Sequence, residues 1–279
     1  MRAHLTSILR FLVFLLWTLV AVPPYLVLVA SGYRRYPAYC SFYWKVTMRL
    51  LAFEAVVRGK PVSGPVLFVA NHASYLDVIV LGSVLPAVFV AKAEVAGWPL
   101  FGFLARVAKT AFIERRPGAA ARERDNLRGR LDEGVPLILF PEGTSNDGNR
   151  VLPFKSSFFA IAEQPLADGR PLPVQPVSVA YTRLDGVAMG RHFRPFYAWY
   201  GDMTLADHMM GALGLGTLTI EIEFHEPVTI EQFRNSRKAL ASHCHDVVAE
   251  GVASALAGRN TALPPATLVE SPAIALLDS

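Results

Sequence analysis

Cysteine and charge are both scarce in this sequence. Its 279 residues include two cysteines, Cys40 and Cys244, and no C-x-x-C pair. This excludes a disulfide framework and a cysteine-rich zinc site, and it fits a reducing compartment. Charged residues make up 18% of the chain and hydrophobic residues 52%. So low a share of charge favours a membrane-associated protein over an ordinary soluble enzyme.

Signals for metal, nucleic acid or a serine nucleophile are also missing. The net charge of +4 does not indicate nucleic acid, because an anionic membrane surface or an anionic substrate explains it equally well. His243, Cys244 and His245 are consecutive, and adjacent residues of a helix point apart, so we expect no metal there. The sequence has no G-x-S-x-G elbow, the turn that carries the nucleophile of many hydrolases.

The N-terminal segment, residues 1–55, has the composition of a membrane anchor. Phe11–Gly32 contains no charged residue and is long enough to cross a hydrocarbon core. Pro23 and Pro24 predict either a kinked spanning helix or two short embedded pieces. Residues 36–53 mix aromatic with basic side chains and predict an interfacial helix. A cleaved signal peptide is disfavoured, because the apolar run is long and no small-residue cleavage site follows.

Short β-like runs alternate with helical ones after residue 55, which predicts an α/β fold. The expected structure is a mostly parallel sheet flanked by helices on both faces. We assign residues 56–258 to this domain and 259–279 to a flexible, proline-containing tail. Strands are expected at 56–59, 65–70, 87–92, 110–115, 135–140 and 173–181, with a partly exposed one at 217–228. Helices are expected at 74–85, 99–108, 120–134, 156–165 and 230–258.

The stretch NHASYLD, residues 71–77, places polar side chains between two hydrophobic runs. Ser74 and Asp77 have the spacing of a capping box, which would start a helix. Side chains of a first helical turn lean back toward the preceding loop, so Asp77 could also orient His72 there. Such a pair would hold the imidazole in one tautomer and suit a general base. From the spacing alone, capping and catalysis are equally good explanations.

Two further stretches follow strand-like runs. FPEGTSNDGNR, from Phe140, lies where the carboxyl end of a parallel strand would bind a ligand, although it could also be an ordinary turn-rich loop. FIERR carries Arg115 and Arg116, which suit an anion site because guanidinium groups match phosphate geometry. A solvated basic loop is the plainer explanation of these arginines.

The stretches NHASYLD, FIER, FPEGT and PVQPVSV, in this order, resemble the four sequence blocks of the glycerolipid acyltransferase family. Its best-known members are the 1-acyl-sn-glycerol-3-phosphate acyltransferases. Residues 60–180 carry the similarity, a stretch of domain size. The resemblance implies transfer of an acyl chain from acyl carrier protein or acyl-CoA to the hydroxyl of a lysolipid, with no cofactor and no metal. It implies His72 as the general base, Asp77 as its orienting residue, Arg115, Glu142, Gly143 and Thr144 as acceptor-binding residues, and Pro176 as a residue that shapes the acyl site.

One departure from the family bears on the acceptor. The family usually has an arginine after EGT, which would pair with the acceptor phosphate, whereas this chain has Ser145. The run FPEGTSNDGNRVLPFKSS is similar to bacterial lyso-ornithine lipid acyltransferases, whose acceptor has a zwitterionic head. Lysophosphatidate and lyso-ornithine lipid therefore both stay open as acceptors. The implied location is the bacterial inner (cytoplasmic) membrane, with the catalytic domain facing the cytoplasm.

Two other functions are compatible with these residues. A non-catalytic lipid-binding membrane protein could keep the same fold, but it would have no need of His72, Asp77 and Glu142 together. A lipid hydrolase could use His72 to activate water, and it would release fatty acid without an acceptor.

Overall fold

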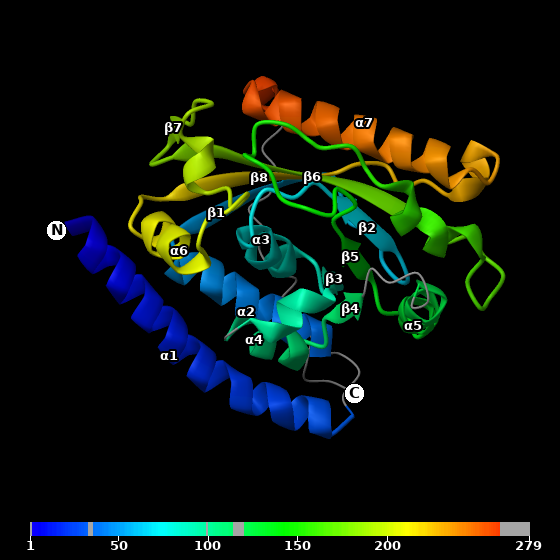
Figure 1. The fold of residues 1–279 in the computed structure, drawn as a ribbon, viewed down its shortest axis with the longest axis horizontal. Coiled ribbons are helices and arrows are strands. Elements are labelled where there is room, and N and C mark those ends of the chain that lie inside the picture. The colour runs from blue at the N-terminus through cyan, green and yellow to red at the C-terminus, as the bar shows by residue number, and fades with distance from the viewer. Residues whose placement is uncertain (1, 33–35, 99, 114–119, 263–279) are drawn as a thin grey trace.

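One mostly parallel sheet organises the chain (Figure 1). The computed structural model describes residues 2–32, 36–98, 100–113 and 120–262. Within them, eight strands lie in the order β1-β8-β6-β2-β5-β3-β4, with β7 paired to β6. Neighbouring strands of that path run parallel except β8 and β6, which are antiparallel. This confirms the expected α/β class.

The elements follow the predicted alternation closely. The strands are β1 (Phe53–Arg58), β2 (Leu67–Ala70), β3 (Val88–Lys92), β4 (Ala111–Ile113), β5 (Leu137–Leu139), β6 (Val174–Leu184), β7 (Val187–Ala188) and β8 (Leu218–Phe224). The α-helices are α1 (Arg2–Ala30), α2 (Tyr36–Leu50), α3 (Leu76–Val84), α4 (Phe101–Val107), α5 (Ala120–Asp132), α6 (Leu205–Leu213) and α7 (Arg237–Leu256). Short 3-10 helices cover Ala93–Gly97, Ser156–Glu163, Arg194–Phe196, Ile230–Phe233 and Arg259–Ala262.

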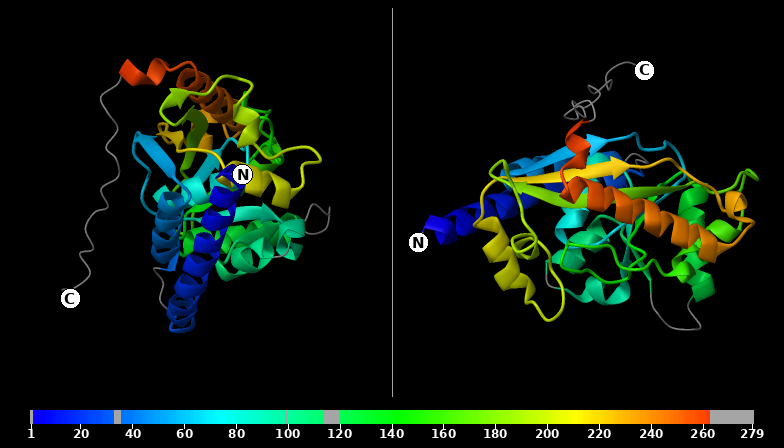
Figure 2. Two further views of the ribbon diagram at one scale, coloured as in Figure 1. Left: turned by 90° about the vertical axis from the view of Figure 1, so that its left-hand side faces the viewer. Right: turned by 90° about the horizontal axis from the view of Figure 1, so that it is seen from above.

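Side chains of the central strands divide between two hydrophobic cores. In β2, Leu67 and Val69 belong to one core, while Phe68 and Ala70 belong to the other. This follows from the two-residue period of a strand, which sends alternate side chains to opposite faces. Helix α7 covers one face, and α2 and α3 cover the other (Figures 1 and 2). Both faces are therefore buried, as the continuous apolar runs require.

Strand β8 differs from its prediction as a partly exposed strand. Most of its residues are buried, including Glu221, whose carboxylate lies 3.8 Å from Nε of Arg58. Strand β1 pairs with the outer edge of β8 and places the strand inside the sheet. Thr219 and Glu223 keep the partial exposure that the alternation predicted, so the prediction was wrong only for Glu221 among the alternating polar positions.

The long C-terminal helix begins later than predicted. Arg234 and Asn235 have positive φ values of 52° and 57°, which break the helical run after a short 3-10 helix. Ser236 then caps α7 by accepting a hydrogen bond from the backbone N–H of Ala239 at 3.3 Å. The sequence pattern also missed α6.

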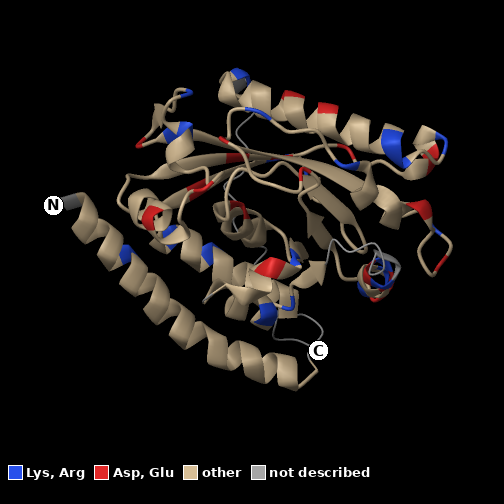
Figure 3. Cartoon of the chain, in the orientation of Figure 1, with Lys and Arg blue, Asp and Glu red and all other residues tan. Residues whose placement is uncertain are grey.

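Helix α1 is continuous through Pro23 and Pro24. Its residues Ala3–Ala30 are long and apolar enough to cross a membrane. The helix packs along the domain against α2 and α6, and Figure 3 shows it nearly free of charge. A stripe of it is buried, formed by Ser7, Phe14, Thr18, Ala21 and Tyr25.

The opposite side of α1 exposes only apolar side chains over most of its length. Leu9, Leu16 and Val20 are examples, and each is more than half exposed. Of the predicted flexible tail, only Arg259–Ala262 belongs to the described residues, and it forms a 3-10 turn. Residues 263–279 of that prediction lie outside them.

Close packing of α7 on the sheet gives a first prediction. A Cβ at Gly251 would lie 2.3 Å from Oγ of Ser178 and 2.7 Å from Nε2 of His225. We expect Gly251→Ala to lower the free energy of unfolding by about 1–3 kcal/mol through overpacking. Gly129→Ala in α5 is the matched control, because its Cβ would meet nothing within 4 Å. That variant should gain up to about 1 kcal/mol of helix propensity. Denaturant unfolding followed by tryptophan fluorescence measures both, and equal effects would contradict the packing.

Candidate active site

Asn71 ends β2 and begins the loop that carries the candidate base. Its side-chain amide donates to the carbonyl of Val179 at 2.9 Å, and its oxygen accepts from the N–H of Val179 at 2.8 Å. The Asn71 side chain thus makes the two hydrogen bonds to β6 that a further backbone residue of β2 would otherwise make. The backbone does not need to stay in the sheet for this pairing, so it can turn away at His72.

His72 and Asp77 meet as the sequence predicted. Nδ1 of His72 lies 2.9 Å from Oδ2 of Asp77, and the same oxygen accepts the backbone N–H groups of Ala73 at 2.8 Å and Ser74 at 3.0 Å. Oδ1 accepts the hydroxyl of Tyr181 at 2.5 Å. The Asp77 side chain is buried, so these four donors take the place of water around its charge.

Ser74 lies one residue before the N-cap position of α3, so the predicted capping box forms only in part. Tyr75 precedes the first helical residue and makes no side-chain capping bond. The Ser74 hydroxyl instead accepts from the N–H of Leu76 at 3.3 Å. The acidic half of the motif is present, because Asp77 reaches back to the N–H of Ser74. The helix start and the orientation of His72 therefore depend on the same carboxylate.

Tyr181 is a partner of Asp77 that the sequence patterns did not reveal. Burial, together with the nearby charge of Asp77, raises the pKa of its phenol well above the usual value. The phenol therefore keeps its proton and donates a hydrogen bond to Asp77. Its ring stacks on Tyr197, with 6.3 Å between ring centroids.

The imidazole of His72 is held on a second side by Phe140. The two rings stack with 4.1 Å between centroids and 17° between planes. Nδ1 is engaged by the carboxylate, so Nε2 is the nitrogen left to take a proton. His72 is also partly exposed, at 22% of its side chain. This arrangement can act as a general base on a hydroxyl placed beside it.

Glu142 clamps the second loop to the first. One carboxylate oxygen accepts the N–H of His72 at 2.8 Å, and the other accepts the amide of Asn146 at 2.7 Å and the N–H of Leu152 at 2.9 Å. The N–H of Asn146 in turn donates to the carbonyl of His72 at 3.2 Å. Burial raises the pKa of Glu142 to about 7, although these three N–H groups favour its ionised form.

Ser145 joins a third segment to the site. Its hydroxyl donates to the carbonyl oxygen of Trp199, and the N–H of Trp199 donates to the carbonyl of Ala73 at 2.9 Å. The segment around Trp199 is thereby fastened to both loops. No pattern in the local sequence had placed it near His72.

His72 opens into a pocket of about 1190 Å³, here called the His72 pocket. It lies at the carboxyl ends of β2, β3 and β5, where ligands of open α/β sheets bind. Among its described lining residues, Lys92 is the only lysine or arginine. Its lining includes His72, Tyr75, Phe89, Lys92, Trp98, Phe140, Gly143, Thr144, Ser145, Phe158, Trp199 and Tyr200.

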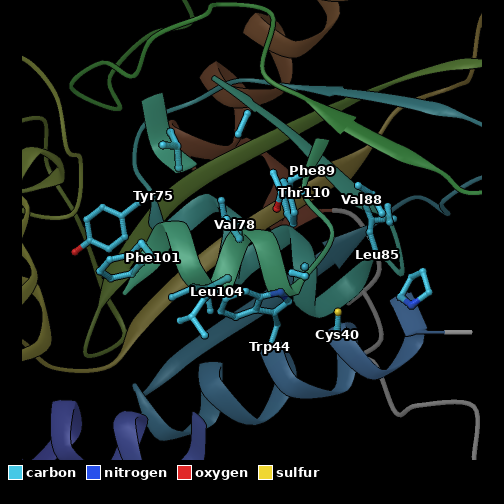
Figure 4. Close-up of a pocket in the computed structure, with 18 of the residues that line it drawn as sticks. Cys40, Trp44, Tyr75, Val78, Leu85, Val88, Phe89, Phe101, Leu104 and Thr110 are labelled. Atoms are coloured by element: carbon cyan, nitrogen blue, oxygen red, sulfur yellow. The ribbon is translucent and has the colours of Figure 1, made fainter. Parts of the chain in front are cut away.

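A second cavity of about 1040 Å³, the apolar pocket, is drawn in Figure 4. It adjoins the first, because the two have lining residues in common. It lies among α2, α3, β3 and α4, and Trp44, Leu85 and Leu104 are among its walls. Its lining is almost entirely hydrophobic, which suits a hydrocarbon chain. The two pockets share the lining residues Tyr75, Val78, Phe89, Ala91, Val95 and Trp98.

The structure brings some of the predicted acceptor and acyl residues together and leaves others apart. Gly143 and Thr144 line the His72 pocket beside the base, but Glu142 does not. Pro176 is buried in β6 opposite Val69, and it lines neither pocket. Arg115 lies in 114–119, outside the described residues.

Three residues of the site were missed by the sequence reasoning. Lys92 ends β3 at the ligand-binding edge of the sheet, so its position could have been recognised from the strand pattern. Tyr181 lies two residues after the fourth block, in β6, and nothing in this part of the sequence indicates that its hydroxyl reaches Asp77. Trp199 follows a turn-rich segment without periodicity and could be placed only by the fold.

Comparisons with known proteins identify relatives of this chain. A protein-family model described as Acyltransferase matches residues 54–180. The lyso-ornithine lipid O-acyltransferase of Brucella abortus is 41% identical over 230 residues, covering 81% of this chain and 85% of that protein. The protein of the same name from Rhodobacter capsulatus is 37% identical over 224 residues, covering 80% and 79%.

A solved structure has the same fold. The crystal structure of the 1-acyl-sn-glycerophosphate (LPA) acyltransferase from Thermotoga maritima superposes with a TM-score of 0.62 and 25% sequence identity. The match covers 91% of this chain and 97% of that one. The arrangement of sheet and helices described above is therefore shared by both proteins.

The elevated pKa of Glu142 predicts a pH dependence of stability. The folded chain binds this proton more tightly than the unfolded chain, whose carboxyl has the ordinary value of 4.5. Between pH 4.5 and about 7, unfolding releases the proton, so a rising pH favours the unfolded state. The free energy of unfolding should therefore fall by about 1 kcal/mol per pH unit across this window and level off above it.

Glu142→Gln is the comparison variant, because glutamine does not titrate. The NH₂ group of this glutamine would face the N–H donors that Glu142 accepts from. This lowers the stability of the variant by an amount that does not change with pH. Urea unfolding of both proteins from pH 5 to 8 measures the difference in slope. Parallel stability curves would show that Glu142 titrates normally.

Proposed function

Because this chain belongs to the acyltransferase family, we propose that it acylates the free hydroxyl of a lysolipid at a membrane surface, with lyso-ornithine lipid as the acceptor. The donor in this proposal is acyl carrier protein or acyl-CoA, and no bound cofactor or metal takes part. The observation that carries the proposal is the His72–Asp77 pair, 2.9 Å apart, with His72 in the wall of a pocket that also contains a lysine and that shares lining residues with an apolar pocket.

In the proposed reaction, Nε2 of His72 takes the proton of the acceptor hydroxyl. The hydroxyl oxygen attacks the thioester carbonyl, a carbon–oxygen bond forms and the carbon–sulfur bond breaks. The imidazolium returns its proton to the leaving thiolate, so the base is regenerated with each turnover. Asp77 stabilises the imidazolium and keeps Nδ1 as the donor to its own Oδ2.

The two pockets suit the two substrates. We assign the acyl chain of the donor to the apolar pocket, since its hydrophobic walls match a hydrocarbon (Figure 4). The acceptor head is assigned to the His72 pocket, whose lining includes Gly143, Thr144 and Lys92. Arg115 stays a proposed contact of the head group. Glu142 and Pro176 are proposed to act indirectly, the first through the loop of His72 and the second through β6.

The acceptor assignment rests on the relatives and on Ser145. Both relatives named above act, by their names, on lyso-ornithine lipid. The solved structure is of a lysophosphatidate enzyme, so that lipid is the second candidate acceptor. In this chain the position after EGT holds a serine whose hydroxyl is engaged with Trp199. A purified-protein assay that offers both lysolipids side by side decides between them.

Membrane association is proposed from α1. Its buried stripe attaches it to the domain, while Arg10 donates to the carbonyls of Leu213 and Leu215 at 3.0 and 2.6 Å. Its other side exposes apolar residues that water would solvate poorly. We propose that this side enters the bilayer of the inner membrane and holds both pockets at the lipid surface, with the catalytic domain on the cytoplasmic side. Residues 1–55 would then be the anchor of the domain that follows.

Removal of the base tests the mechanism. We expect His72→Ala to lower kcat by at least about 100-fold, because general-base catalysis contributes that much or more. His243→Ala on α7, on the far side of the sheet, is the matched control and should keep wild-type turnover. The measurement is transfer of a labelled acyl chain to lyso-ornithine lipid by membrane-reconstituted protein. Near-normal activity of a folded His72→Ala protein would refute the mechanism.

Asp77→Asn separates orientation of the base from support of α3. The amide cannot accept from all four donors, so both stability and activity should fall. At a temperature where the variant is still folded, its activity should nevertheless be lower than that of the wild type, because His72 is no longer held in place. A loss confined to stability would leave Asp77 with a structural role only.

Charge on the outer side of α1 tests the membrane proposal. Leu16 and Leu19 are 63% and 72% exposed, so lysine at both positions should fold but resist entry into hydrocarbon. We expect at least about a tenfold weaker partition into vesicles. Ala253→Lys, at an exposed position of α7, controls for the added charge. Vesicle flotation measures the partition of each variant. Equal flotation of the variant with lysine at positions 16 and 19 and of the Ala253→Lys control would count against insertion of α1.

A further inference from the structure

Three aromatic rings form one wall of the His72 pocket. Trp98 and Trp199 meet with 5.3 Å between centroids and 80° between planes, and Tyr75 meets Trp199 at 6.2 Å and 70°. All three line the pocket. The rings pack edge to face and line one space together, and a ring face that lines a pocket can bind an ammonium group.

The charges of the pocket fit a zwitterion. Lys92 supplies a cation to its lining, while no aspartate or glutamate occurs among the lining residues that the structure describes. Among the described lining residues, an ammonium group entering this pocket meets aromatic rings and no carboxylate. The negative faces of indole and phenol rings attract a cation and repel a phosphate.

Trp199 is unusually well fixed for a residue outside a helix or strand. Its N–H donates to Ala73, its carbonyl accepts the hydroxyl of Ser145, and its indole N–H donates to the carbonyl of Met203 at 2.9 Å. The ring is thus oriented before a ligand arrives, which reduces the entropy lost on binding. An arginine at position 145 would lack the short hydroxyl that makes this bond.

We propose that Tyr75, Trp98 and Trp199 form a subsite for the ammonium group of a zwitterionic acceptor, with Lys92 pairing with the carboxylate of the same head. Ser145 is a positioning residue of this subsite, because it holds Trp199 in place. The inference rests on the proposed function, since it concerns the acceptor of that reaction. According to this inference, the three rings determine the preference for a zwitterionic acceptor over an anionic one.

The test combines a change in the wall with a change in the ligand. Trp199→Leu removes a ring that lines the His72 pocket but not the apolar pocket. The acceptors are lyso-ornithine lipid, the same lipid acetylated on its side-chain amine, and lysophosphatidate. The readout is the ratio of kcat/KM for lyso-ornithine lipid to kcat/KM for lysophosphatidate, which a general loss of folded protein leaves unchanged.

We expect Trp199→Leu to lower this ratio about tenfold, within the range of a partly desolvated cation–π contact. Acetylation of the amine should lower kcat/KM of the wild type about equally, and mainly through KM. The two losses should not add, because each removes the same contact. Trp199→Phe keeps a ring face and should retain most of the ratio. Phe233→Leu, next to α7, is the control and should leave the ratio unchanged.

Ser145→Ala tests the positioning role without altering the wall itself. Loss of the bond to Trp199 should lower the same ratio about threefold, in line with one hydrogen bond. Melting temperature is measured in parallel, since a purely structural serine would lower stability and leave the ratio as it was.

The outcomes separate the two proposals. If the wild type acylates lysophosphatidate but not lyso-ornithine lipid, the acceptor in the proposed function is wrong. If it acylates lyso-ornithine lipid and the ratio is insensitive to Trp199→Leu and to acetylation, the aromatic subsite is overturned while the proposed function stands. Additive losses would place the ammonium elsewhere and equally overturn the subsite.

Discussion

The buried carboxylate of Asp77 is the interaction on which the rest of this site depends. A charge without exposure to water is costly unless donors surround it. Here the donors come from the loop after β2, from the turn that starts α3 and from β6 through Tyr181. Each of these segments has to hold its place for the charge to be satisfied. The orientation of His72 is therefore secured by the same contacts that keep Asp77 stable in the protein interior.

Most of the fold could be predicted from the sequence, because long apolar runs and their periods report burial directly. Failures occurred where a neighbour in space decides the outcome. Burial of Glu221 in β8, beside Arg58 of β1, could not be predicted from alternation. The predicted start of α7 was too early because Arg234 and Asn235 adopt positive φ values that no sequence pattern predicts. Helix α1 continues through Pro23 and Pro24, although prolines inside a helix usually break or kink it.

The site divides in the same way. His72 and Asp77 are five residues apart in one loop and helix start, so local geometry was enough to pair them. Ser74 was misassigned because the spacing of a capping box does not say which half of the motif forms. Trp199 and Tyr181 reach the base only through the fold, far from it along the chain. Lys92 is an intermediate case. Its place at the carboxyl end of a predicted parallel strand indicates a ligand site, but its position beside His72 follows only from the fold.

The attachment of α1 has a practical consequence for work with this enzyme. Phe14 belongs to the same hydrophobic core as Met48 and Leu51, and Arg10 holds the last carbonyls around α6. Cutting away residues 2–30 to obtain a water-soluble preparation would uncover that core and strip α6 of its partner. The apolar helix cannot be discarded as a handle separate from the catalytic domain. Purification and crystallisation would have to keep the whole chain and supply detergent or lipid to cover the outer side of α1.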